Sequence, residues 1–210
     1  MIVVNFSTEN YSRPQNRLSR SLKHLPKLMF TSYEEIGSPT HSESPYEFKI
    51  HAIEKAFQHD DIVLWCDSSM YLVGDITKVE TIIKETGYFM EEAGHYAGRW
   101  TNQHTRDYFN VTEEEMKQEA GGMIMFSAGF LGLNKNSPVA MTFFEEWKAA
   151  ANAGCFRGDW IDHRHDMTAG SIIACRLKMK FQRGGSHAAY IGPGYSAPEP
   201  GVCFFLQGMA

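Results

Sequence analysis

The feature that most constrains the fold is the apolar run between Asp61 and Asp67, with the sequence Ile-Val-Leu-Trp-Cys. A strand with one face in water would alternate apolar and polar residues, and this run does not. It therefore predicts a strand that is buried on both faces, as in the centre of a parallel sheet. Such a strand needs helices on both sides of its sheet.

Strand and helix signals alternate before this run. Residues 2–6 and 27–31 predict strands, and a helix is expected from about residue 13, with Ser12 as its N-cap. A second helix is expected to begin at Ser44, which is followed by proline and, two positions later, by glutamate. This order of elements is typical of a parallel sheet.

The rest of the chain adds further elements to the same architecture. The sequence predicts helices at about 76–86, at 137–152 and after residue 166, and strands at 95–100, 123–126 and 202–206. We therefore expect one α/β domain over residues 1–210, with a mixed, mostly parallel sheet between helices. The last strand lies close to residue 210, so this domain could be the N-terminal part of a longer polypeptide.

Composition narrows the class of protein. The net charge is -5 and the sequence has no long basic run, so nucleic acid is not an expected partner. The four cysteines are scattered and form no C-x-x-C pair, which fits a reducing compartment such as the cytoplasm. No apolar run is long enough for a membrane span, and the first residues do not resemble a signal peptide.

Asp67 and the two serines after it form the first candidate site. Ligands of open α/β sheets bind beyond the carboxyl ends of the strands, and a carboxylate there could hold a hard cation and a phosphate. The alternative is that Asp67 caps a turn whose backbone Ser68 and Ser69 satisfy. The small residues of segment 127–129 would let a ligand approach the backbone closely.

The densest polar cluster is segment 159–166, with the sequence Asp-Trp-Ile-Asp-His-Arg-His-Asp. Asp166 could simply be the N-cap of the following helix. That role does not explain the neighbouring histidines, arginine and aspartates, which favour an anion site, a general base or a metal site. Segment 99–104 combines Arg, Trp, Asn and Gln, a polar and aromatic mixture that is suited to binding a sugar.

Three cationic residues could act on a pyrophosphate. Arg13 and Arg17 lie near the start of the first helix, and Lys49 lies in the first turns of the helix that leads to the central strand. For Arg13 and Arg17 the alternative is a solvated stripe that they share with Arg20. For Lys49 the alternative is an ordinary surface lysine.

Three short pieces, taken together, resemble one family. They are Tyr-Glu-Phe-Lys at 46–49 with Leu-Trp-Cys-Asp-Ser-Ser at 64–69, Ser-Ala-Gly-Phe at 127–130, and His-Arg-His-Asp-Met at 163–167. The chain resembles nucleotide-sugar glycosyltransferases of the GT-A fold, and particularly small bacterial and viral members with an H-R-H-D-Q-S motif. Virus-encoded glycosyltransferases that decorate the capsid protein of large algal viruses belong to the group that it is similar to.

The resemblance implies roles for individual residues. Asp67 resembles the first acid of the D-x-D motif, which binds a divalent cation, Mn²⁺ or Mg²⁺, and the sugar nucleotide; Ser69 stands where the second acid is expected. Asp166 resembles the acid at the reaction centre, with His165 and Arg164 beside it, and His187 resembles a late metal-binding histidine. The remaining residues implied in nucleotide-sugar binding are Phe6, Ser7, Tyr11, Arg13, Arg17, Lys49, Ser68, Ala128 and Gly129.

The activity implied is transfer of a hexose or deoxyhexose from a nucleoside-diphosphate sugar, with UDP favoured, to a glycan or glycoprotein. For a viral enzyme the reaction would take place in the host cytoplasm. One alternative is a metal-dependent hydrolase that uses Asp162, His163, His165 and Asp166 as ligands. Another is a non-catalytic domain that binds sugar nucleotides, because the acid pair is incomplete.

Overall fold

A five-stranded sheet forms the centre of the molecule in the computed structural model, which describes residues 1–118, 121–191 and 200–207. Its strand order is β2-β1-β3-β6-β5. β1 pairs in parallel with β2 and β3, whereas β6 pairs antiparallel with β3 and β5. The bounds are β1 Ile2–Phe6, β2 Lys27–Phe30, β3 Ile62–Cys66, β5 Tyr88–Tyr96 and β6 Ile124–Asn134.

The apolar run between Asp61 and Asp67 is β3, the middle strand, and all five of its residues are buried. Burial on both faces was predicted from its lack of alternation and is confirmed. The predicted α/β class, with a mixed central sheet between helices, is confirmed as well.

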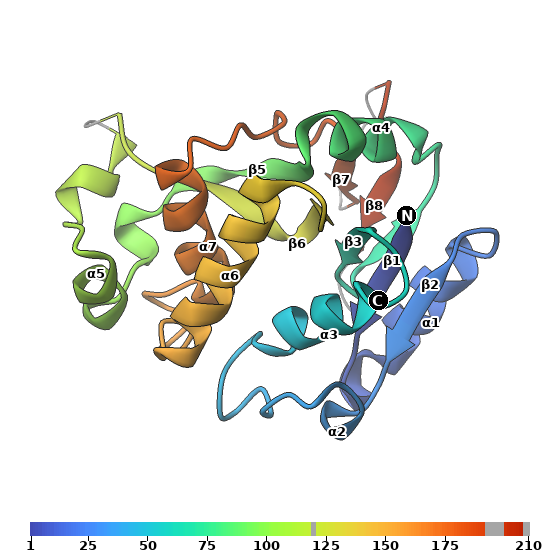
Figure 1. The fold of residues 1–210 in the computed structure, drawn as a ribbon, viewed down its shortest axis with the longest axis horizontal. Coiled ribbons are helices and arrows are strands. Elements are labelled where there is room, and N and C mark those ends of the chain that lie inside the picture. The colour runs from blue at the N-terminus through green and yellow to red at the C-terminus, as the bar shows by residue number, and fades with distance from the viewer. Residues whose placement is uncertain (119–120, 192–199, 208–210) are drawn as a thin grey trace.

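Helices cover both faces of this sheet (Figure 1). One core contains apolar residues of α3, α6 and α7, and the other contains residues of α1 and α4. β1 contributes to both, because Val4 lies in the first core and its neighbour Val3 in the second. The helices are α1 Ser12–Ser21, α2 Tyr33–Ile36, α3 Phe48–Ala56, α4 Thr77–Thr86, α5 Gln103–Phe109, α6 Pro138–Asn152 and α7 His165–Arg176, and the short 3-10 helices are η1 Glu9–Tyr11, η2 Gly98–Trp100 and η3 Glu114–Met116.

A small second sheet brings the C-terminal residues back to the middle of the chain. It consists of β4 Met70–Leu72, β8 Phe204–Leu206 and β7 Ala188–Tyr190, in the order β4-β8-β7. β4 follows β3 almost directly, so this sheet lies next to the carboxyl end of the central strand. No helix in the described parts of the chain is long and apolar enough to cross a membrane.

Two predicted boundaries are wrong. The helix expected from Ser44 begins instead at Phe48, because Tyr46 has a φ of +63°, in the left-handed region that ends helical continuity. The strand expected at 95–100 is the end of β5, and η2 follows it. Segment 127–129 lies within the continuous strand β6, where the pairing of β6 with β5 shifts in register between Met90 and Glu92.

Candidate active site

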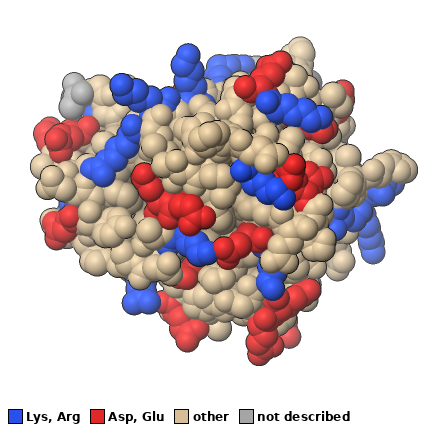
Figure 2. All heavy atoms as spheres, in the orientation of Figure 1, with Lys and Arg blue, Asp and Glu red and all other residues tan. Residues whose placement is uncertain are grey.

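A cleft of about 720 Å³ lies beyond the carboxyl end of β3, between β6, β5 and the first turn of α7. Seven candidate site residues line it, from α3, β6, the start of α7 and the loop after β3: Lys49, Asp67, Ser69, Ala128, Gly129, Arg164 and Asp166. Acidic and basic side chains are interspersed on the face shown in Figure 2, so no field of one sign dominates it. The electrostatic potential in the cleft is therefore set by the few charged residues that line it.

Lys49 is the centre of this group. Its side chain is 3% exposed, and its Nζ lies 2.9 Å from Asp166 Oδ2 and 3.4 Å from Asp67 Oδ1. The same ammonium donates a hydrogen bond of 3.1 Å to the backbone oxygen of Ala128. The surface-lysine alternative is thus wrong. One buried cation joins α3, β3, β6 and α7 at a single point.

Burial and the two carboxylates act in opposite directions on Lys49. Burial lowers the pKa of its ammonium, but Asp166 and then Asp67 outweigh that effect, and the pKa lies above its ordinary value. Burial raises the pKa of the Asp166 carboxyl, and Lys49 opposes part of the rise. The cluster therefore holds a permanently charged lysine beside a carboxylate that is more basic than an exposed aspartate.

Asp67 is the more accessible acid, with 36% of its side chain exposed. Its Oδ1 accepts a hydrogen bond of 2.7 Å from Trp65 Nε1, which fixes the carboxylate. A Cβ placed on Gly129 would lie 2.7 Å from Asp67 Oδ2. Glycine at position 129 therefore leaves room for this oxygen next to β6.

Ser68 connects the loop after β3 to β1. Its side chain is buried and donates a 3.2 Å hydrogen bond to Asn5 Oδ1, and Asn5 in turn donates to the backbone oxygen of Cys66 at 2.7 Å. Gln15 of α1 completes the network with bonds to Asn5 and to the Phe30 backbone. These bonds fix the ends of β1, β2 and β3 relative to each other. The Ser68 hydroxyl therefore bonds to β1 and not to the backbone of the turn, and its role toward a nucleotide sugar stays a prediction.

The residues at the start of α7 have different environments. Asp166 is 3% exposed and faces Lys49, and Arg164, rather than Asp166, is the N-cap. His165 is 5% exposed, and its Nδ1 lies 2.8 Å from the backbone oxygen of Phe156. Because a carbonyl only accepts, Nδ1 carries the proton. His165 has a φ of +46° and its ring packs against Tyr46, which also has a left-handed φ; such outliers cluster at functional sites.

His163 does not point into a metal centre. Its Nε2 bonds the backbone oxygen of Cys155 at 2.8 Å, and its Nδ1 accepts a long hydrogen bond of 3.4 Å from Asn102 N. Burial lowers its pKa to about 4, so the ring is neutral near pH 7. Among the described residues no three His, Cys, Asp or Glu side chains are placed to hold a metal ion. The ligand cluster that the hydrolase alternative requires is therefore not formed.

Five of the residues predicted to bind the nucleotide sugar lie outside the lining of the cleft, namely Phe6, Ser7, Tyr11, Arg13 and Arg17. Phe6 is buried between the rings of Tyr33 and Phe48, at centroid distances of 4.7 and 4.8 Å, and Ser7 is 3% exposed. Tyr11 is exposed in η1. Arg13 and Arg17 line a separate hollow of about 400 Å³ together with Ser12, Asn16 and Arg20.

Arg17 connects that hollow to the loop after β3. It donates to the backbone oxygen of Ser69 at 3.1 Å and to Gln207 Oε1 at 3.0 Å, and its guanidinium lies 5.2 Å from the centroid of the Tyr71 ring. It therefore holds the small second sheet against the loop. Its role toward a nucleotide, like those of Phe6, Ser7, Tyr11 and Arg13, stays a prediction.

His187 is buried near the cleft without lining it. Its Nδ1 lies 2.8 Å from Ser186 Oγ and 3.3 Å from Glu91 Oε1, and Glu91 also accepts from the His187 backbone at 2.5 Å. Its Nε2 is buried and has no hydrogen-bond partner among the described residues. Its role as a metal ligand stays a prediction.

Sequence reasoning missed two side chains that shape the cleft. Trp65 lies two residues before Asp67, and this spacing placed both on one face of the chain, where the indole binds the carboxylate. Tyr46 lines the cleft with its ring 5.1 Å from Lys49 Nζ. Burial, followed by the charge of Asp166, raises the pKa of Tyr46 to about 12, so its hydroxyl stays a neutral donor.

The cleft offers few oxygen ligands for a metal cation. Asp67 offers one partly exposed carboxylate, and Ser69 lines the cleft beside it. Mg²⁺ is commonly bound by one or two carboxylates together with substrate phosphates and water. These residues therefore fit a cation that is shared with a bound diphosphate, and they do not form a cage that would hold a cation alone.

The fold can be compared with solved structures. A glycosyltransferase involved in the glycosylation of the major capsid of PBCV-1 superposes with a TM-score of 0.60 at 11% identity, over 99% of this chain and 94% of that one. The chain has the fold of a glycosyltransferase. Mouse xyloside xylosyltransferase 1 gives a TM-score of 0.54 at 13% identity, over 99% and 98% of the two chains.

A bifunctional glycosyltransferase, WbbM, shares the fold over only part of its length. Its TM-score is 0.54 at 12% identity, over 90% of this chain and 40% of that one. No protein-family model and no curated protein sequence matches the chain. At these identities the likeness shows the fold, and function has to be argued from the cleft.

Proposed function

We propose that the protein is a glycosyltransferase that moves a hexose or deoxyhexose from a nucleoside-diphosphate sugar, with UDP favoured, to a glycan or glycoprotein. The observation that supports this most is the Asp67–Lys49–Asp166 cluster at the cleft. The fold shared with glycosyltransferases agrees with it.

Transfer of a sugar releases a diphosphate, and the site has to stabilise that departing charge. Lys49 holds a positive charge next to Asp67, where the donor would lie, and Gly129 leaves the room for a close approach. A divalent cation bound by Asp67, Ser69 and the diphosphate would act as a Lewis acid on the leaving group. In this arrangement the oxygens of the diphosphate would coordinate the cation in place of the second carboxylate, so serine could stand at position 69.

Asp166 is the residue that we assign to the reaction centre. Its carboxylate is buried, lies at the cleft and has a pKa raised by burial. A carboxylate with these properties can accept a proton from an acceptor hydroxyl or stabilise positive charge on the transferred sugar. Lys49, at 2.9 Å, sets the position of its oxygen.

The acceptor class is supported by a similar structure, and the compartment by the cysteines. A similar structure belongs to a glycosyltransferase involved in the glycosylation of the major capsid of PBCV-1, which supports a glycoprotein or its glycan as the acceptor, and a viral capsid protein is one candidate. The four cysteines are free, which agrees with the cytoplasm, or with a host cytoplasm for a viral enzyme.

The experiment is a turnover assay with purified protein, Mn²⁺ and UDP-, GDP- and dTDP-sugars, in which the released nucleoside diphosphate is measured. We expect release from one class of donor, and a loss of at least a hundredfold in Asp166→Asn. Glu145→Ala, an exposed position on α6, is the control and should turn over like the wild type.

Two results would contradict the proposal. If Asp166→Asn released the nucleoside diphosphate at the wild-type rate, Asp166 would not be the residue at the reaction centre. Tight nucleotide-sugar binding without release of diphosphate under any condition would favour the non-catalytic binding domain instead.

A further inference from the structure

Trp160 is a large aromatic side chain that the sequence left without a role. It lines the cleft together with Arg164 and Asp166, yet 51% of its surface is exposed. An indole of this size is usually buried, so an exposed one at the edge of a cleft calls for a ligand.

The ring of Trp160 is held in place from several directions. Arg164 lies between two indoles, with its guanidinium carbon 4.2 Å from the Trp160 centroid and 3.6 Å from that of Trp100, and it also donates to the Trp160 backbone oxygen. His165 stacks on Trp160 at 5.5 Å with an interplanar angle of 25°. The ring is therefore positioned before any ligand binds, which lowers the entropy cost of binding.

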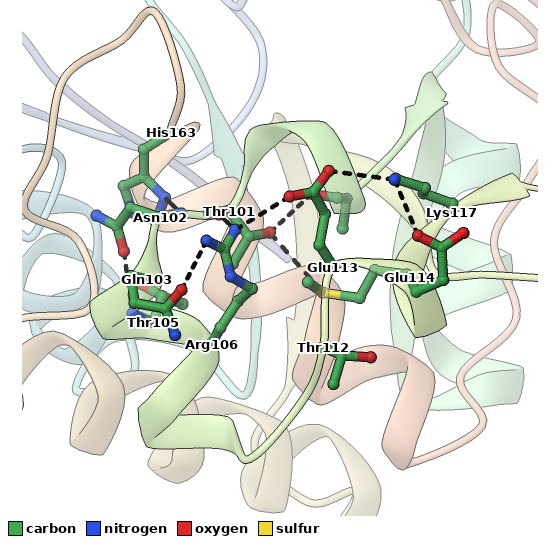
Figure 3. A network of polar contacts seen from close by, with 12 residues as sticks. Thr101, Asn102, Gln103, Thr105, Arg106, Thr112, Glu113, Glu114, Lys117 and His163 are labelled. Carbon is green, nitrogen blue, oxygen red and sulfur yellow. Dashed lines mark hydrogen bonds and ion pairs between the residues drawn. The ribbon is translucent and has the colours of Figure 1, made fainter.

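The loop that carries Trp160 is equally well anchored. Asp159 closes a turn by accepting hydrogen bonds from the backbone of Ile161 and His163. His163 then ties the loop to segment 101–106, through its long hydrogen bond with Asn102 N (Figure 3). Thr168 binds the backbone oxygen of Trp100 at 2.7 Å, which fixes the start of α7 to the same segment. Asp159, His163 and Arg164 thus hold the loop that carries Trp160.

Carbohydrate chemistry fits this arrangement. One face of a pyranose ring presents C–H groups that stack on an indole, while its hydroxyls need polar partners. The cleft supplies both, because Glu92 and His95 line it together with Trp160. Other apolar ligands would not need these polar side chains, and a flexible peptide would not need a flat, fixed ring.

We propose that Trp160 is the platform for the acceptor, and that the acceptor is therefore a sugar residue of a glycan rather than a side chain of an unmodified protein. The pyranose stacks on the indole and directs one hydroxyl toward Asp166. This inference rests on the proposed function and names the acceptor class at the same site.

The test uses methyl α- and β-glycosides of glucose, galactose, mannose, xylose and fucose as acceptor probes. With the donor that the wild type turns over, Trp160→Ala should lower kcat/KM for the best glycoside about tenfold, mainly by raising KM. A tenfold loss equals about 1.4 kcal/mol, which lies at the upper end of what aromatic stacking contributes. Trp160→Phe keeps a ring and should lose no more than about threefold.

Ile161→Ala is the matched control, since Ile161 is the neighbouring apolar residue, is 80% exposed and does not line the cleft. It should behave like the wild type. Affinity for the nucleoside diphosphate of that donor, measured by calorimetry, checks that donor binding is intact in each variant. Trp160→Ala with wild-type KM for every glycoside, or transfer to peptides alone, would overturn the proposal.

A binding measurement separates this inference from the proposed function. Saturation-transfer NMR should show contacts from the protein to glycoside ring protons in the wild type, and their loss in Trp160→Ala. Glycosides that bind through Trp160 without turnover of any nucleotide sugar would support the platform and refute the transferase. Turnover that does not depend on Trp160 would support the transferase and refute the platform.

Discussion

The Lys49 ammonium is buried and forms ion pairs with two carboxylates, those of Asp67 and Asp166. A buried charge of this kind is strongly stabilised by its partners, and the removal of one member leaves the others uncompensated. The same three side chains that define the candidate active site should therefore also contribute to stability.

Lys49→Met should lower the free energy of unfolding by about 3–5 kcal/mol, because Asp166 would then be buried without a cation. Lys49→Met/Asp166→Asn should recover part of that loss while turnover stays absent. Urea unfolding measures both. Lys148→Met is the control, since Lys148 pairs with Glu54 near the surface and should cost no more than about 1 kcal/mol. Equal losses for the two lysine variants would contradict the buried-cluster account.

Gly129→Ala should affect nucleotide binding without destabilising the fold. Gly129 has no left-handed φ, so alanine is compatible with its backbone. The added Cβ would lie 2.7 Å from Asp67 Oδ2 and displace that carboxylate. We expect UDP affinity in the presence of Mn²⁺ to fall at least tenfold, measured by calorimetry, with a change in unfolding free energy below about 1 kcal/mol. Unchanged affinity would show that Asp67 does not bind the donor.

At the scale of elements, the loop between α6 and α7 depends on His163. Its pKa is lowered from an ordinary value of 6.5 to about 4, mainly by burial. Between these values the unfolded chain binds more protons than the folded one, so stability is present above pH 6.5 and is lost as the pH falls toward 4.

This group should account for a loss of about 2 kcal/mol between pH 7 and pH 5. His163→Gln should be less stable at pH 7 but should show a smaller loss over the same pH range, in urea unfolding at each pH. His59→Gln is the control, because His59 is exposed. The account fails if His163→Gln and His59→Gln have the same pH dependence.

Element types were predictable where local signals are strong, and boundaries were not. Pro138 opens α6, and Gly87, with a φ of +90°, ends α4, as the sequence indicated. The helix signal at Ser44 failed because Tyr46 takes a left-handed conformation next to His165, which is 119 positions away and not visible in a local pattern. Tertiary contacts outweighed the N-cap signal there.

The whole molecule shows why the site was only partly predictable. A strand buried on both faces gives the same sequence pattern whether its neighbours are parallel or antiparallel, so the antiparallel place of β6 beside β3 had to come from the structure. That pairing puts Gly129 against Asp67. Sequence reasoning found both residues, and α3 and α7 then bring Lys49 and Asp166 to them.

The assignments that did not converge on the cleft have a physical cause as well. Phe6 was expected at the nucleotide, but Tyr33 and Phe48 cover its ring. The dense cluster at 159–166 suggested ligands, whereas hydrogen bonds to backbone atoms occupy His163. A polar side chain that anchors a loop and one that binds a ligand look alike in a sequence, and only the partners distinguish them.

The most direct test of the central claim is thermal unfolding with UDP, GDP, dTDP and their sugar conjugates, each with and without Mn²⁺. A ligand at a hundredfold excess over its Kd adds about 2.7 kcal/mol, or roughly 5 to 10 °C in Tm for a chain of this size. We predict such a shift for one nucleotide class, dependent on Mn²⁺ and lost in Asp67→Asn, with little shift from Mn²⁺ alone. A large shift with Mn²⁺ alone and none with any nucleotide would contradict the account.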